Sequence, residues 1–443
     1  MPRTPGLLLL IADDWSPLAG CYGTSGLHTP HVDRLAGRAV RFDAAHCTTP
    51  SCAASRATLL TGLHSHQHGQ YGHCHGRHGF STHADVDSLA TLLQRAGVPS
   101  ALIGKRHVAP ASVYPFSHGE QASPWEIAPA ADQLAGFLRG AAGRPFFATV
   151  ASLYPHRTGA DFDAAIGDDL ARDDAPLDPD AADLPGFLPD TPAVRGEYAA
   201  YLRFVRRFDR FVGAMLRVLE ESGRGDDTLV LLLSDHGMPF PGAKASPSQA
   251  GHRCPLFAAA PGGAAGACGR VVDWTDVYPT AREWLGLPEP ADGFPRVGRS
   301  LLPLLTDPSA EHRPHAFFSH QTHEVTNFWP YRAALGPRHK LVRHLRPEVL
   351  LPMPTDLFDS TTFAEVRRLG LEQAVRRFPE EALYDLEADP WERHNLIDDP
   401  ALAPAADALR AALLGFRLET RDPWLELDHQ AGRLAQRPAF LDA

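Results

Sequence analysis

The chain has 443 residues, of which 44% are hydrophobic and 21% charged, and these proportions exclude disordered and fibrous classes. The length allows two or three domains, or one large α/β domain with an appendage. Acidic residues outnumber basic ones by 53 to 42, and the net charge of −11 argues against a whole face that binds nucleic acid.

The first predicted element is a core strand at Leu7–Ala12. This apolar run meets Asp13 and Asp14 at once, so it is shorter than the ~20 residues of a membrane span. It is also too short for a secretory leader, and no cleavage site follows it. We therefore expect no membrane segment and a cytoplasmic location, with secretion left open.

Three further strands are predicted, each a continuous apolar run that ends in ionisable residues. The runs Pro99–Gly104, Pro145–Ser152 and Thr228–Ser234 end at Lys105-Arg106-His107, Tyr154-Pro155-His156 and Asp235-His236. Continuous runs are typical of parallel strands that are buried on both faces. Because ligands of open α/β sheets bind at the carboxyl ends of the strands, a site is predicted where these polar residues meet.

The remaining elements divide the chain into two predicted domains. Apolar residues at helical spacing predict a packed helix over Val194–Ser222 that stops at Gly223. The acidic stretch Asp161–Asp183 is predicted to be a solvated loop. After residue 309 short strand-like pieces take over, namely His315–Ser319, Tyr331–Leu335, Lys340–Leu345 and Ala382–Leu386. We predict a large α/β domain over residues 1–309 and a smaller α+β domain over residues 310–443.

The densest motif runs from Thr48 to Gly62 and reads TTPSCAASRATLLTG. Cys52 lies where a turn rich in Pro and Ser gives way to a good helix former, and Arg56 follows one turn later. The helix dipole and the arginine both favour an anionic or polar form of the Cys52 side chain.

This stretch resembles the hallmark of the sulfatase family, Cys-x-Pro-Ser-Arg followed by a helix that ends Leu-Leu-Thr-Gly. The Gly104-Lys105 pair, the Asp13-Asp14 and Asp235-His236 strand ends, Asp276–Thr280 and Gly298–Leu301 match further family motifs in the expected order. The resemblance implies an alkaline-phosphatase-like large domain with a mostly parallel central sheet flanked by helices, and a smaller C-terminal α+β domain.

Other segments resemble the branch of the family that acts on N-sulfated glucosamine. They are Lys105–Val108, Val113–Phe116, Met238–Pro241, His323–Thr326 and Glu419–Trp424. The implied reaction is hydrolysis of a sulfamate or sulfate ester on a small sulfated sugar, most of all N-sulfoglucosamine at a glycosaminoglycan terminus. His323 and Glu324 are candidate sugar-binding residues from the second domain, and an interdomain hydrogen-bonded pair is an equal alternative.

The resemblance also implies that a formylglycine-generating enzyme oxidises Cys52 to formylglycine. One hydroxyl of the aldehyde hydrate attacks sulfur, and the second allows sulfate to be released, which divides one difficult step into two. Lys105 and Lys244 would neutralise the sulfuryl oxygens. His107 would take the proton of the second hydroxyl, His156 would protonate the leaving group, and Arg56 would hold the nucleophile in place.

One divalent metal ion is implied, with Asp13, Asp14, residue 52, Asp235 and His236 as its predicted ligands. Ca²⁺ is favoured by the family, whereas His236, which stands where most sulfatases have Asn, suits Mn²⁺, Zn²⁺ or Fe²⁺ better. Asp-His at this place also occurs in relatives that cleave phosphonate monoesters and phosphodiesters. An O-sulfatase or such a hydrolase is therefore the alternative activity.

Two further departures from the family pattern bear on maturation and the site. Ala54 replaces the usual Pro of the hallmark, which leaves an unmatured carbohydrate-binding pseudoenzyme as an alternative of another class. Lys244 stands where the sulfamidase branch has Arg. A homodimer is possible, and no nucleic-acid partner is expected.

A histidine-rich tract follows the cysteine helix. It comprises His64, His66, His68, His73, His75 and His78, together with Cys74. The spacing is irregular and lacks the pairs of a zinc site, so structural or substrate-rim roles are predicted. Cys21, Cys47, Cys254 and Cys268 are predicted to be core or inert surface residues.

Overall fold

The computed structural model describes residues 4–119, 123–159, 162 and 177–441. Most of the predicted acidic loop, residues 161 and 163–176, lies outside the described residues. A seven-stranded sheet forms the centre of the larger part, in the order β4-β5-β1-β6-β7-β2-β8. Its strands are β1 (Gly6–Ala12), β2 (Val40–Phe42), β4 (Ser100–Gly104), β5 (Phe146–Ala151), β6 (Thr228–Ser234), β7 (Leu256–Ala259) and β8 (Gly266–Cys268).

The four predicted strands are confirmed and lie next to one another as the parallel half of this sheet. β4, β5, β1 and β6 pair in parallel, with Leu8 opposite Ala148 on one side and Val230 on the other. The short strands β7, β2 and β8 complete the sheet, and β7 runs antiparallel to both of its neighbours. Ser234 and Ala12 end level with each other, so the polar residues after β1 and β6 begin side by side.

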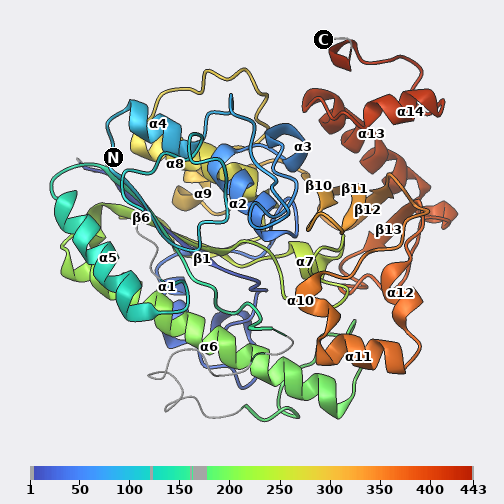
Figure 1. The fold of residues 1–443 in the computed structure, drawn as a ribbon, viewed down its shortest axis with the longest axis horizontal. Coiled ribbons are helices and arrows are strands. Elements are labelled where there is room, and N and C mark those ends of the chain that lie inside the picture. Colours follow the sequence, from blue (N-terminus) through green and yellow to red (C-terminus); the bar gives the residue numbers. More distant parts are fainter. Residues whose placement is uncertain (1–3, 120–122, 160–161, 163–176, 442–443) are drawn as a thin grey trace.

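Helices cover both faces of the sheet (Figure 1). Leu8 and Leu10 face one layer, whereas Leu7 and Leu9 face the other, and all four are fully buried. Burial of each such leucine contributes about 1.5–3 kcal/mol. The first layer contains α1 (Pro30–Ala36), α5 (Ile127–Gly140) and α6 (Pro192–Glu221). The second contains α2 (Cys52–Thr61), α4 (Leu89–Arg95), α8 (Val277–Leu285) and α9 (Leu302–Thr306).

The C-terminal part is built on a second, antiparallel sheet of four strands in the order β10-β11-β12-β13. The strands are β10 (Ala316–Thr322), β11 (Phe328–Leu335), β12 (His339–His344) and β13 (Glu381–Asp385), so all four predicted pieces are strands. The long helix α13 (Ala403–Glu419) covers one face through Leu409, Leu413 and Phe416. Shorter helices surround this sheet: α10 (Thr355–Phe358), α11 (Thr361–Arg368), α12 (Glu372–Arg376) and α14 (Leu425–Gln430).

The two parts meet along β10. The Ser319 amide donates to the Thr48 carbonyl (2.9 Å), and the Ser65 hydroxyl donates to the Ser319 carbonyl (2.7 Å). Three short elements lie on the large side of this seam, namely α3 (Ser65–His68), α7 (Gln249–His252) and the β3 (Ala45–His46)–β9 (Val272–Asp273) pair. The exact domain boundary at residues 309 and 310 stays a prediction. Among the described residues, no helix combines the length and apolarity that a membrane span needs.

The predicted long helix is confirmed as α6, which ends at Glu221, two residues before the left-handed Gly223 (φ 70°). The cysteines outside the hallmark also match their prediction. Cys47, Cys254 and Cys268 are buried and Cys21 is half-buried. Burial raises the pKa of the Cys21 thiol to about 12 and that of Cys47 well above its usual value, so both are inert thiols at neutral pH.

Buried neutral histidines predict that the fold loses stability in mild acid. Burial lowers the pKa of His64 to about 4 and those of His68 and His320 to about 3. The unfolded chain takes up these protons below its ordinary pKa of about 6.5, while the folded chain does not. Stability should therefore be full above pH 6.5 and fall toward pH 4, by up to about 1.4 kcal/mol per pH unit for each histidine.

Urea unfolding at pH 7, 6 and 5 measures this loss. His64→Gln should reduce the pH dependence, whereas His394→Gln, at an exposed histidine, should leave it unchanged. A free energy of unfolding that stays flat from pH 7 to pH 5 would contradict the assignment of neutral buried histidines.

Candidate active site

The carboxyl ends of the parallel strands bring the predicted residues to one place. Asp13 and Asp14 follow β1, and Asp235 follows β6 directly. Lys105 follows β4, and His156 comes shortly after β5. Gly104 makes the close approach of β4 possible: it has a φ of 82°, and a Cβ there would lie 2.1 Å from the Ala151 carbonyl oxygen. Only glycine fits this position without moving the backbone of β5.

Helix α2 places Cys52 over these strand ends. The helix begins at Cys52 after the extended Ser51 and ends at Gly62, which adopts the left-handed conformation (φ 69°). Cys52 is 1% exposed, and its Sγ lies 3.3 Å from His236 Nε2. The residue at position 52 therefore lies at the helix N-terminus, where the dipole stabilises negative charge.

Asp235 joins three elements of the site. Its Oδ1 accepts hydrogen bonds from the backbone amides of Asp14 (3.1 Å) and His236 (2.9 Å). Its Oδ2 accepts from Arg56 Nε (2.9 Å), and its carbonyl accepts from Ser55 Oγ. The arginine that was predicted to hold residue 52 thus connects α2 to the end of β6.

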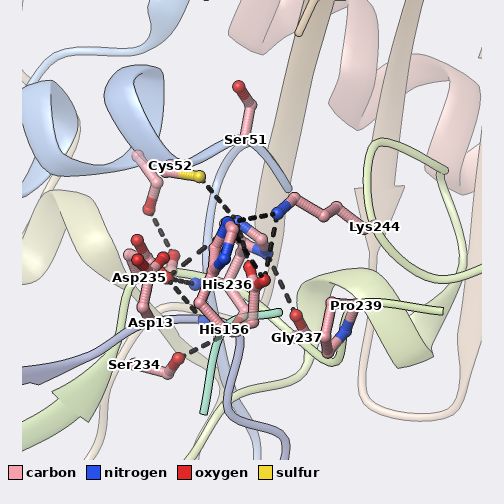
Figure 2. A network of polar contacts seen from close by, with 12 residues as sticks. Asp13, Ser51, Cys52, His156, Ser234, Asp235, His236, Gly237, Pro239 and Lys244 are labelled. Carbon is pink, nitrogen blue, oxygen red and sulfur yellow. Dashed lines mark hydrogen bonds and ion pairs between the residues drawn. The ribbon is translucent and has the colours of Figure 1, made fainter. Parts of the chain in front are cut away.

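Four side chains surround one point between β1, β6 and α2. One ligand atom each from Asp13, Asp14, Cys52 and His236 lies within 4.8 Å of the others. Figure 2 labels Asp13, Cys52 and His236 of this group. Asp13 Oδ1 and Asp14 Oδ1 are buried and make no hydrogen bond, although His236 Nε2 is only 3.0 Å from Asp14 Oδ1. Because His236 Nδ1 donates to the Gly237 carbonyl (3.0 Å), its Nε2 is free to offer a lone pair.

These donors fit a divalent metal ion. Two buried carboxylate oxygens that accept no hydrogen bond and an imidazole nitrogen at one point are a mixed oxygen and nitrogen ligand set. Both carboxylate oxygens of Asp235 already accept hydrogen bonds, so Asp235 lies beside this group without an unbonded oxygen directed at the ion. Its assignment as a ligand stays a prediction.

Electrostatics favour positive charge at the same point. Burial alone would raise the pKa of Asp14, but Lys244, His156 and His236 outweigh burial and hold it well below its usual value. Asp235 is likewise held low by Arg56 against its burial. Burial acts to lower the pKa of His236, yet Asp235 and Asp14 raise it well above its usual value. A bound cation would replace the proton that these carboxylates otherwise draw onto His236.

The two predicted lysines are paired with different carboxylates. Lys105 Nζ contacts Asp13 Oδ2, and Lys244 Nζ donates to Asp14 Oδ2 (3.0 Å). Lys244 also donates to Asp356 Oδ2 (2.6 Å). Both ammonium groups remain charged, because these carboxylates offset the burial that would otherwise lower their pKa values.

His156 lies against Lys244 with its ring orientation fixed. Its Nδ1 lies 2.6 Å from the Arg157 carbonyl, which can only accept, so Nδ1 carries a proton. Nε2 is then the atom that exchanges protons, 3.3 Å from Lys244 Nζ and 3.6 Å from Asp356 Oδ2. Figure 2 shows His156 and Lys244 close to the carboxylates.

A pocket of about 660 Å³ opens beside Cys52. One wall is formed by the loop after β4, where His107 adopts a left-handed backbone (φ 49°), and another by the histidine-rich tract. The C-terminal part contributes Glu324, Thr355 and Asp356. Its volume and its many ionisable lining residues suit a monosaccharide-sized ligand.

The two candidate sugar-binding residues take different positions. His323 is buried, and its Nδ1 lies 2.9 Å from Ser51 Oγ, next to the cysteine itself. Glu324 lines the pocket and accepts hydrogen bonds from the hydroxyl and the amide of Thr355. His323 therefore supports the turn before α2, whereas Glu324 lies at the pocket wall with both carboxylate oxygens bonded to Thr355. The sugar-binding assignment of both residues stays a prediction.

Asp356 is the site residue that sequence reasoning missed. Asp356 belongs to no recognisable motif and does not follow a strand. It lies in the four-residue helix α10. Its contacts to Lys244 and His156 are made across more than 100 residues of chain. Ser51 was also missed, although its place directly before Cys52 was a usable signal.

The structure divides the histidine-rich tract into two halves. His66 bonds Ser319 Oγ (2.8 Å) and Thr420 Oγ1 (2.9 Å), and His68 bonds Thr58 Oγ1 (3.3 Å), so this half supports the fold. His73, His75 and His78 line the pocket. The predicted structural and rim roles thus belong to different members.

The chain belongs to the sulfatase family, whose model matches residues 5–287. It is 34% identical to human N-sulphoglucosamine sulphohydrolase, over 96% of this chain and 92% of that protein. It is also 28% identical to an ulvan-active sulfatase of Formosa agariphila, over 89% of this chain and 76% of that protein.

Solved structures confirm the alkaline-phosphatase-like fold. A protein in complex with its substrate D-glucosamine-2-N,6-O-disulfate superposes with a TM-score of 0.69 at 19% identity, covering 95% of this chain and 99% of that one. A phosphonate monoester hydrolase from Silicibacter pomeroyi gives a TM-score of 0.67 at 20% identity, covering 95% and 96%. Family membership implies a divalent metal ion and a formylglycine.

Removing one of the open carboxylates should remove the metal. Asp13→Asn keeps the volume of the side chain but deletes the charge that Lys105 and the ion share, so metal content and turnover should both be lost. Metal analysis of the purified variant measures the first and a turnover assay the second. Full metal occupancy in Asp13→Asn would show that the ion binds elsewhere.

The imidazole should set the choice of metal. His236→Asn replaces a nitrogen ligand by an amide oxygen, so the preference should shift toward Ca²⁺ and away from Mn²⁺ or Zn²⁺ while the fold is kept. Competition binding of the three ions to the wild type and the variant measures the shift. An unchanged order of affinities would remove His236 from the ligand set.

Proposed function

We propose that this chain hydrolyses the sulfamate of N-sulfoglucosamine at the end of a glycosaminoglycan-derived sugar. The observation that carries the proposal is the placement of Cys52 at the start of α2, facing Asp13, Asp14 and His236 at the base of a polar pocket. The 34% identity to the human sulphohydrolase over nearly the whole chain supports the sulfamate as the group that is cleaved.

Residue 52 supplies the nucleophile in this proposal. As a formylglycine hydrate, it would offer two hydroxyls on one carbon, and the divalent ion would lower the charge on a sulfate oxygen. Asp13, Asp14 and His236 would hold that ion. Arg56, fixed by Asp235, keeps residue 52 in position, which lowers the entropic cost of attack.

In this proposal the two lysines stabilise the transferred sulfuryl group, and the two histidines transfer protons. Lys105 and Lys244 stabilise negative charge on the sulfuryl oxygens as it redistributes. His156 Nε2 delivers a proton to the departing sugar nitrogen, with Lys244 3.3 Å away as its neighbour. Burial lowers the pKa of His107 well below its usual value, and Lys105 adds to the shift, so His107 is neutral and ready to accept a proton.

Maturation must precede folding in this proposal. Cys52 is 1% exposed and begins α2 directly after Ser51, whose hydroxyl contacts His323, and Arg56 ties the same helix to Asp235. A formylglycine-generating enzyme would need this stretch in an extended form. Ala54 is the third residue of α2 and is fully buried, so its departure from the family pattern affects recognition of the unfolded stretch and not the finished site.

A phosphonate monoester or phosphodiester hydrolase is the second candidate, and His236 is the observation that favours it. A panel of N-sulfoglucosamine, an aryl sulfate and a phosphodiester separates the two. The proposal expects the largest kcat/KM for the sulfamate. Preference for the phosphodiester would overturn it in favour of the second candidate.

The nucleophile is tested by mass. Protein coexpressed with a formylglycine-generating enzyme should carry an aldehyde at residue 52, visible in the peptide mass and by aldehyde-reactive labelling. Cys52→Ala should label nowhere and be inactive. Full activity with an unmodified thiol would rule out the formylglycine mechanism, and an inert unmodified chain would favour the pseudoenzyme alternative.

The acid is tested with two leaving groups. A sugar amine leaves poorly unless it is protonated, whereas a nitrophenolate leaves unaided, and general acid catalysis contributes roughly 10²–10⁴-fold. His156→Ala should therefore lower kcat for N-sulfoglucosamine by about this factor and largely spare a nitrophenyl sulfate. Equal losses for both substrates would make His156 a positioning residue.

A further inference from the structure

A second group of metal-ligand side chains lies in the pocket wall, away from the Asp13–Asp14 site. His73 and His75 come from the loop after α3, and His107 from the loop after β4. One nitrogen from each lies within 4.8 Å of the other two. His75 Nδ1 and His107 Nε2 are 3.0 Å apart, and the rings of His73 and His107 are separated by 4.8 Å between centroids.

These distances suit a tetrahedral ion. Zinc bonds of about 2.0–2.1 Å to nitrogen hold neighbouring ligand atoms about 3.3 Å apart. The separation of His75 and His107 is within a few tenths of an ångström of this value. The three nitrogens lie within 4.8 Å of one another and would have to draw closer to bind one ion.

An unpartnered nitrogen in the same group points to a missing ligand. Within the described residues, His73 Nε2 is buried and forms no hydrogen bond. Burial of an unsatisfied polar atom costs free energy, and native structures seldom leave such atoms without a partner. The contact between His75 and His107 does not satisfy His73 Nε2.

The protonation states agree with metal binding. Burial lowers the pKa of His73 to about 3 and those of His75 and His107 below their usual values, so all three rings are neutral at pH 7. Neutral imidazole is the form that binds a metal. Lys244 and Lys105 oppose a cation here, while the carboxylates of Glu324 and Asp356 favour one.

We propose that His73, His75 and His107 form a second metal site that takes Zn²⁺ or an ion of similar softness. Three imidazoles without a carboxylate discriminate against Ca²⁺, which prefers oxygen ligands. Three protein ligands also leave a fourth position for water. His73, His78 and Glu324 form a competing set of ligands. Because both sets need His73, they cannot each hold an ion at the same time.

Occupation of this site would inhibit the enzyme. Coordination takes a lone pair of His107 out of proton transfer, so Zn²⁺ should slow turnover reversibly and a chelator should restore it. This consequence rests on the proposed role of His107. Zinc binding itself does not, and it is measured separately.

The experiment counts zinc bound to the full chain, with the metal content of each preparation determined first. Titration against a chromophoric chelator at pH 7.5 should reveal one high-affinity Zn²⁺ beyond the resident metal. His75 is exposed, so His75→Gln should not disturb the fold. The zinc affinity of this variant should fall by at least roughly 10–100-fold, which is the loss that follows removal of a residue that only supports a ligand. His78→Gln is the matched control and should keep the affinity.

Turnover in the presence of Zn²⁺, relative to each variant's own zinc-free rate, gives the second measurement. The wild type and His78→Gln should be inhibited, and His75→Gln should be resistant. The proposal is overturned if no extra zinc binds, or if His75→Gln binds it as tightly as the wild type. Loss in His78→Gln with retention in His75→Gln would likewise overturn it and assign the ion to the competing set.

Discussion

The site depends on the hydrogen bonds and the ion pair made by the carboxylate of Asp235. Through two backbone amides and Arg56, this carboxylate connects the turn after β1, the end of β6 and the helix that begins with Cys52. The indole of Trp274 adds a hydrogen bond to the Asp235 carbonyl (3.0 Å) and so ties in the second helical layer. A small displacement of this one residue would move the nucleophile position and both carboxylates together.

Charge balance explains why so many ionised groups can be buried here. Lys105 is neutralised by Asp13, Arg56 by Asp235, and Lys244 by Asp14 together with Asp356. Loss of one partner from such a buried pair costs about 3–5 kcal/mol, because the remaining charge is left in a medium of low polarity. The same dependence keeps every charge in a fixed place before substrate arrives, which is what stabilisation of a developing charge requires.

The parts of the structure that were predictable are those with a continuous local signal. Strands such as β6 are unbroken apolar runs, and their polar ends follow directly, so both the strand and its end residues could be placed. The short strands β2, β7 and β8 carry too few residues for such a signal. Asp356 could not be found, because its role comes from a contact across the domain seam and its own segment has no pattern. The dual role of the histidine tract was hidden for the same reason, since only the fold separates His66 from His73.

The walls of the pocket are built differently from its base. The base stands on the ends of β1, β4, β5 and β6, whereas Glu324 and Asp356 lie in connecting segments beyond β10 and in α10. Loops tolerate exchange far better than buried strands do. Descendants of this chain could therefore acquire new sugar preferences through insertions or substitutions in two short segments, while the reactive centre and the core beneath it are inherited unchanged.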